Sequence, residues 1–154
     1  MCKLNEKVNE NVNEEELKGI ILERIGELKN KFPDVEKLEK MDIHLIDYFS
    51  PSPIYMDENK LMVSTSLIND IPLLNFCLVF AAKCLNYSEE FKKVPIEDRT
   101  FFNIATCYKI NSQLRKYLNK DFKMPKESFD NPMYDNLSLN EIYDKVKVEY
   151  KDYV

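Results

Sequence analysis

The sequence predicts an α+β fold in which a central buried helix is packed by other helices and by a small, mainly antiparallel sheet. Three observations predict it: a continuous apolar run from Ile71 to Tyr87, helical spacing of apolar residues on both sides of that run, and a short β-rich hairpin before it. The chain has 154 residues, of which 44% are hydrophobic. We therefore expect one domain over residues 13–154, preceded by a flexible polar segment, residues 1–12.

The run from Ile71 to Tyr87 is the predicted central helix. It is apolar on nearly every side, so it needs neighbours on several faces. Asn69 or Asp70 can cap its start, and Pro72 lies in the first turn, where a missing N–H costs nothing. Because the run is short for a bilayer and is followed at once by charge, we interpret it as a helix inside a soluble protein and expect no membrane association.

Two helices are predicted before the sheet. Apolar residues recur at helical spacing from Leu17 to Leu28, and Asn13 is placed to cap that helix. Phe32-Pro33 ends it, and Asp34 can cap a short second helix that carries Val35 and Leu38. Both helices present one apolar face, so we expect each to pack on the core.

A strand and a hairpin follow. Residues 41–49 alternate as a half-buried strand does, and the Ser-Pro-Ser-Pro segment of residues 50–53 forces an extended connection. Segments 54–56 and 61–63 flank a polar turn in which Asn59 can take the left-handed conformation. These segments predict the small sheet.

The second half of the sequence predicts two helices and two loops. Residues 88–94 are expected to form a charged loop, and a helix with a wide apolar stripe then runs from Pro95 to Leu118. Residues 121–136 contain two prolines and predict a surface loop. Ser138 and Glu141 predict a capping box at the start of a last helix.

The sequence predicts a cytoplasmic protein that does not contact nucleic acid directly. The net charge of −5 disfavours a direct contact with nucleic acid, because such proteins need a basic surface. The first residues show no export or organelle signal.

The four cysteines include no C-x-x-C pair, and Cys77 and Cys84 are too far apart on one helix for a disulfide. We therefore expect reduced, buried thiols.

The residues themselves offer little catalytic chemistry. His44 is the single histidine, so a site with several histidines is excluded. The two glycines both lie in the first predicted helix, where they cannot build a phosphate-binding loop. Adjacent carboxylates at Glu89-Glu90 and Glu97-Asp98 fit a solvated surface better than an acid–base pair. We expect no bound cofactor.

Four groups of residues carry a resemblance to a known family. They are, in chain order, Asp57 to Leu61 with Ser66; Asp98, Phe102 to Ala105, Ile110, Asn111 and Leu114; Met124, Pro125, Asp130, Leu137 and Ser138; and Glu141 to Asp144. Their order and spacing resemble the metallopeptidase domain of bacterial and phage proteins that often accompanies a von Willebrand factor A-like domain. The resemblance implies a zincin-like fold, in which the hairpin leads into a helix that carries the metal site.

The catalytic residues of that family are replaced here. Its H-E-x-x-H positions fall at Ala81, Ala82 and Leu85, and a further aspartate position falls at Cys107. Apolar side chains need no partner when they are buried, so the helix can serve as core alone. The resemblance therefore implies a pseudoenzyme without a metal. The alternative is an active hydrolase with an unusual metal site at Cys84, Cys107 and Glu90.

The expected function is binding to another protein, and inhibition of a host defence system by a phage or mobile-element protein fits such a role. A second alternative is a homo-oligomeric structural subunit. Exposed loop residues are the expected contacts: Tyr87, Glu89, Glu90 and Phe91, and Phe129, Met133 and Tyr134. The competing interpretation of the last three is that they merely hold their loop against the core.

Overall fold

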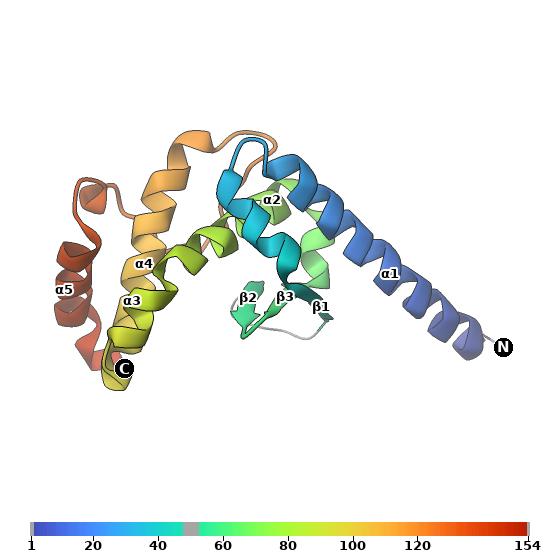
Figure 1. The fold of residues 1–154 in the computed structure, drawn as a ribbon, viewed down its shortest axis with the longest axis horizontal. Helices are drawn as coiled ribbons and strands as arrows, with labels where there is room; N and C mark the ends of the chain where they lie inside the picture. The colour runs from blue at the N-terminus through green and yellow to red at the C-terminus, as the bar shows by residue number, and fades with distance from the viewer. Residues whose placement is uncertain (1, 48–52, 154) are drawn as a thin grey trace. The chain divides into compact units, whose positions relative to one another are not determined.

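The structure is a computed structural model that describes residues 2–47 and 53–153 of the chain (Figure 1). It is a mixed α+β fold, as the sequence predicts. The chain divides into two compact units, Met1–Ala82 and Lys83–Val154, and each is described by itself. The prediction of one domain over residues 13–154 stays a prediction. The predicted connection at residues 50–53 lies almost wholly outside the described residues, as does the end of the predicted strand at residues 48–49.

Helix α1, Cys2–Leu28, begins in the segment that the sequence predicts to be flexible. Lys and Glu are good helix formers, and neither Pro nor Gly interrupts the segment before Gly19, so the backbone stays helical there. Asn13 consequently lies inside α1, and its predicted role as the cap is wrong. The apolar face that the sequence predicts is confirmed: Ile21 and Ile25 are fully buried.

The second predicted helix is present as a 3-10 helix, η1, Pro33–Lys40. Val35 and Leu38 are buried, and η1 packs against α1. The predicted cap at Asp34 is wrong, because the helix already begins at Pro33 and its first flanking residue, Phe32, makes no side-chain cap. Proline fits the first position of a helix, where its fixed φ is already helical.

The sheet holds three strands in the order β1-β3-β2: β1 Asp42–Ile46, β2 Ile54–Asp57 and β3 Lys60–Ser64. The predicted hairpin is confirmed, since β2 and β3 pair antiparallel. Strand β1, however, pairs parallel with β3, so the sheet is mixed and the prediction of a mainly antiparallel sheet is wrong. Local turn chemistry specifies a hairpin, whereas the direction of a strand brought in by a longer connection leaves no local signal.

The hairpin turn differs from its prediction in one residue. Glu58 has the positive φ, 54°, that the sequence assigns to Asn59. The backbone oxygen of Asn59 instead accepts a hydrogen bond from the backbone N–H of Asp42, at 2.9 Å. The turn thus contributes directly to the attachment of β1 beside β3.

Helix α2, Ile71–Cys84, is the predicted central helix. Its start is confirmed: Pro72 lies in the first turn, and an Asp70 carboxylate oxygen accepts a hydrogen bond from the Leu73 backbone N–H, at 3.3 Å. Eight of its fourteen residues are buried. One of them is polar, Asn75, and its amide oxygen accepts a hydrogen bond from Arg24 Nε at 3.0 Å. Burial of an amide is tolerated when it is paired in this way.

The helical run does not stop where the sequence predicts a loop. After the 3-10 turn η3, Leu85–Tyr87, the predicted charged loop is helix α3, Ser88–Lys93. Glu89 and Glu90 lie in its first turn and Lys92 and Lys93 in its last, a charge order that favours a helix. Ile71–Lys93 is the one run among the described residues that is long and apolar enough to cross a membrane, and 44% of its apolar window is buried in the protein. Core helices of soluble proteins pass the same test, so the run is compatible with a soluble protein.

In the unit Lys83–Val154, helix α4, Arg99–Leu114, packs along helix α5, Leu139–Tyr150 (Figure 1). Their shared core consists of five buried residues: Phe101, Ala105, Tyr108, Ile142 and Val146. The predicted capping box is confirmed, since Ser138 Oγ accepts from the Glu141 N–H and Glu141 Oε1 accepts from the Ser138 N–H, both at 3.2 Å. The predicted surface loop between α4 and α5 is also present, with one short 3-10 turn, η6, Pro132–Tyr134.

Candidate functional site: a clamped loop between α4 and α5

The resemblance places the family's active-site residues at four positions, two of which are buried. Ala82 is fully buried and Ala81 is 3% exposed, whereas Leu85 and Cys107 are half-buried. Within residues 2–47 and 53–153, no group of three or more His, Cys, Asp or Glu side chains is placed to hold a metal ion. The predicted alternative of a metal site at Cys84, Cys107 and Glu90 therefore has no matching geometry.

The two cysteines of that alternative lie in environments that favour the neutral thiol. Burial, and to a smaller extent the neighbouring Cys107, raise the pKa of the Cys84 thiol to about 12. Burial likewise raises the pKa of Cys107 to about 11. In the absence of a metal, these thiols stay protonated at neutral pH. Their environment suits small core residues.

The first group of predicted contact residues lies in η3 and α3. Phe91 is half-buried, with its ring centroid 6.2 Å from that of Phe102 and the Arg99 guanidinium 5.0 Å above its ring. Tyr87 is also half-buried, and Glu89 pairs with Lys92 at 3.4 Å. Glu90 is exposed. The aromatic ring of Phe91 therefore supports the fold of its own unit.

The second group lies on the loop before α5, and we call residues 129–135 the binding loop. Tyr134 packs edge to face on Tyr108, at 4.9 Å between centroids, and its hydroxyl donates to Glu149 Oε2 at 2.9 Å. Phe129 packs on Tyr108 at 5.5 Å and on Tyr150 at 6.2 Å, and remains 38% exposed. Both rings hold the loop against α4 and α5, which is the competing interpretation for these two residues.

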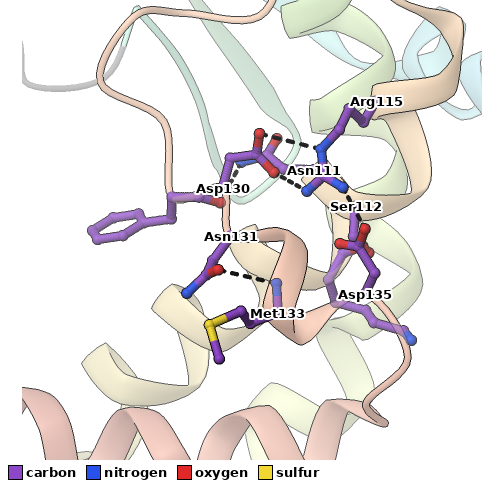
Figure 2. A network of polar contacts seen from close by, with 9 residues as sticks. Asn111, Ser112, Arg115, Asp130, Asn131, Met133 and Asp135 are labelled. Carbon is purple, nitrogen blue, oxygen red and sulfur yellow. Dashed lines mark hydrogen bonds and ion pairs between the residues drawn. The ribbon is translucent and has the colours of Figure 1, made fainter.

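Met133 is different, because its side chain is 84% exposed. Its backbone is nevertheless fixed: the Met133 N–H donates to Asn131 Oδ1 at 3.0 Å, and Pro132 precedes it in η6 (Figure 2). A flexible apolar side chain is thus presented to solvent from an ordered turn. Such a side chain suits contact with another surface.

Arg115 clamps the binding loop at both ends (Figure 2). Its Nε and Nη2 donate to the two carboxylate oxygens of Asp130, and its Nη1 donates to Asp135 Oδ2. These two carboxylates raise the pKa of Arg115 further above its ordinary value, with Asp130 contributing the larger share. A guanidinium is planar and always charged, so one side chain can bind two carboxylates at once and fix their spacing.

Asn111 supports the same loop from α4. It is 2% exposed, and its Nδ2 donates to the backbone oxygen of Phe129 at 2.8 Å. Asn111 Oδ1 and Asp135 Oδ1 are buried without a hydrogen-bond partner among the described residues. Neither Arg115 nor the loop-binding role of Asn111 is among the predictions from sequence. The role of Arg115 could have been predicted, because this arginine lies at the end of a helix and two aspartates follow it in a proline-containing loop.

Replacement of Arg115 by glutamine is expected to lower the free energy of unfolding by about 2 kcal/mol, because two partly buried carboxylates lose their charged donor. Amide hydrogens of Met133 and Tyr134 should then exchange faster, since the turn loses its support. Urea unfolding and hydrogen exchange measure the two effects. The matched control is K116Q at the exposed neighbour, which should change the free energy by less than about 0.5 kcal/mol. Equal effects of both variants would contradict the clamp.

Within the described part of the chain, no group of side chains is placed to hold a metal ion, and the binding loop is ordered and partly apolar. No family model, no curated protein and no solved structure matches this chain.

Proposed function

We propose that the protein works by binding another protein through the binding loop, without catalysis. The observation that supports this proposal is Met133, an 84% exposed apolar side chain on a turn that is held by hydrogen bonds and ion pairs. An apolar side chain gains free energy when a partner covers it. Phe129, 38% exposed and adjacent to the same turn, enlarges the apolar surface that a partner would cover.

The order of the loop adds to this argument. A segment that is disordered before binding must lose conformational freedom when it binds, and this loss weakens the complex. The Arg115 clamp, Asn111 and the Tyr134 contacts remove most of that freedom in the free protein. A clamped loop can therefore bind with a small apolar contact area.

The proposal includes the pseudoenzyme interpretation. We propose that the chain is a degenerate zincin-like protein of the cytoplasm, with apolar residues where the family has its H-E-x-x-H residues. Full burial of Ala82 and near-full burial of Ala81 support this interpretation. A role as an inhibitor of a host defence system is one form that such binding would take.

Replacement of Met133 by serine is expected to leave folding unchanged and to weaken partner binding at least about tenfold, because an exposed side chain contributes little to stability while a central apolar contact dominates an interface. The measurement is affinity capture from cytosol of the source organism, with quantitative mass spectrometry of the captured proteins. The matched control is I96S, since Ile96 is 78% exposed in the same unit but lies outside the binding loop.

Retention of the partner by M133S would contradict the proposal, as would an equal loss with I96S. Capture of the chain itself as the main product, with a dimer or larger species in light scattering, would favour the structural-subunit alternative instead. Thermal unfolding in the presence of zinc or a chelator tests the hydrolase alternative, because a resident metal stabilises the native state.

A further inference from the structure

We propose that the segment joining α4 to the binding loop forms a second contact surface, which recognises an acidic face of the partner protein. We call residues 116–126 the lysine loop. The inference rests on the proposed protein-binding function and names the chemistry of the partner. Four exposed lysines carry it: Lys116, Lys120, Lys123 and Lys126.

The lysine loop has a defined backbone. A bridge pairs Asn119 with Phe122, through hydrogen bonds of 3.1 and 3.2 Å between their backbones. The Asp121 N–H donates to Asn119 Oδ1 at 2.7 Å. The side chain of Phe122 is 5% exposed, and its burial holds the turn against the protein. Lys120 lies within this turn and Lys123 directly follows it, so their positions are set by an ordered backbone.

The charges of the lysine loop are poorly neutralised within the protein. Five lysines elsewhere lie beside a carboxylate: Lys18, Lys29, Lys37, Lys92 and Lys147. By contrast, Lys120, Lys123 and Lys126 have no ion-pair partner among the described residues, and the Lys116 ammonium lies 5.2 Å above the ring of Tyr117.

Nearby carboxylates neutralise the positive charge of the lysine loop only in part. Asp130 and Asp135 share the single positive charge of Arg115, so these three side chains together keep one negative charge. Asp121 lies within the loop and Glu127 directly follows it, and both are exposed. With the charge left on the Arg115 group included, the four lysines exceed the surrounding carboxylates by one positive charge, on a chain whose net charge is −5. Opposite charge on a partner would complete the pairing and speed encounter.

An acidic protein face fits this surface better than a nucleic acid does. The two aromatic rings of the loop are not free for base stacking, because Phe122 is buried and Tyr117 is half-buried beneath Lys116. Arg115, the guanidinium beside the loop, is occupied by carboxylates and cannot bind phosphate as a fork. Leu118, 38% exposed, adds an apolar contact that suits a protein surface.

The test uses a fluorescently labelled oligo-glutamate peptide as the probe and fluorescence anisotropy as the measurement. The full chain should bind the peptide, and K116Q/K120Q/K123Q/K126Q should weaken binding by about tenfold, the combined effect of four exposed ion pairs. K40Q/K60Q/K145Q/K151Q is the matched control, because it removes the same charge from exposed lysines elsewhere. It should change the affinity by less than about twofold.

Equal weakening by the control would overturn the inference, because binding would then reflect net charge alone. Tighter binding of a single-stranded oligonucleotide than of the peptide, lost in the lysine-loop variant, would assign the surface to nucleic acid and would also overturn it. The proposed function is tested separately: if M133S loses the captured partner while the lysine-loop variant retains it, only the inference about the acidic face fails. If the wild type captures no partner, the proposed function fails, whatever the peptide shows.

Discussion

Replacement of Ala82 by glutamate should unfold the protein or lower its free energy of unfolding by about 4 kcal/mol. Ala82 is fully buried in α2, in a stretch whose neighbouring residues Val79 and Ala81 are also buried. A carboxylate placed there has no partner, and a buried group without one must either be protonated or leave the core. Urea unfolding followed by circular dichroism measures the change.

The control for this variant is N103E, which adds the same side chain at an exposed position of α4. It should shift the free energy of unfolding by less than about 0.5 kcal/mol. If A82E instead kept the stability of the wild type, α2 would tolerate a charge at the position where the proposed resemblance places the family's glutamate. That result would contradict a purely structural role for the helix.

Truncation of Ile142 to alanine is the second change that should strongly lower the free energy of unfolding. Ile142 is fully buried between α4 and α5, where it packs with Phe101 and Ala105. The lost burial and the cavity together should lower the free energy of unfolding by about 3 kcal/mol. Because α5 also carries Glu149 and Tyr150, which contact the binding loop, partner binding should weaken in proportion to the unfolded fraction.

The matched control is V148A, a truncation on the same helix at a side chain that is 72% exposed. Its free energy of unfolding should stay within about 0.5 kcal/mol of the wild type. Similar losses in both variants would mean that α5 is not packed by the face that the structure describes.

Local signals predicted much of the fold. The cap and first-turn proline of α2, the capping box of α5 and the hairpin of β2 and β3 each depend on a few neighbouring residues, and each is confirmed. The parallel pairing of β1 depends on a connection whose course no local pattern encodes. The helix α3 was missed because its charges were interpreted as loop character, although their order along the segment favours a helix.

The candidate site was predicted only in part. Exposed Met133 is among the predicted contact residues, whereas Tyr134, Phe129 and Phe91 pack largely within their own unit. An aromatic residue in a polar segment gives the same pattern whether it faces solvent or the core, so sequence alone could not separate them. Arg115 was missed because it is charged and lies at a helix end, and its partners follow 15 and 20 residues later. Long-range ion pairs leave no periodic pattern.

The central claim is that a partner protein covers the binding loop, and site-specific photo-crosslinking tests it most directly. A photoreactive amino acid placed at position 133 in the native host should give one discrete adduct with a second protein. The same group at position 96, which is comparably exposed, should not give it. An absence of any adduct from position 133, or the same adduct in equal yield from position 96, would contradict the account.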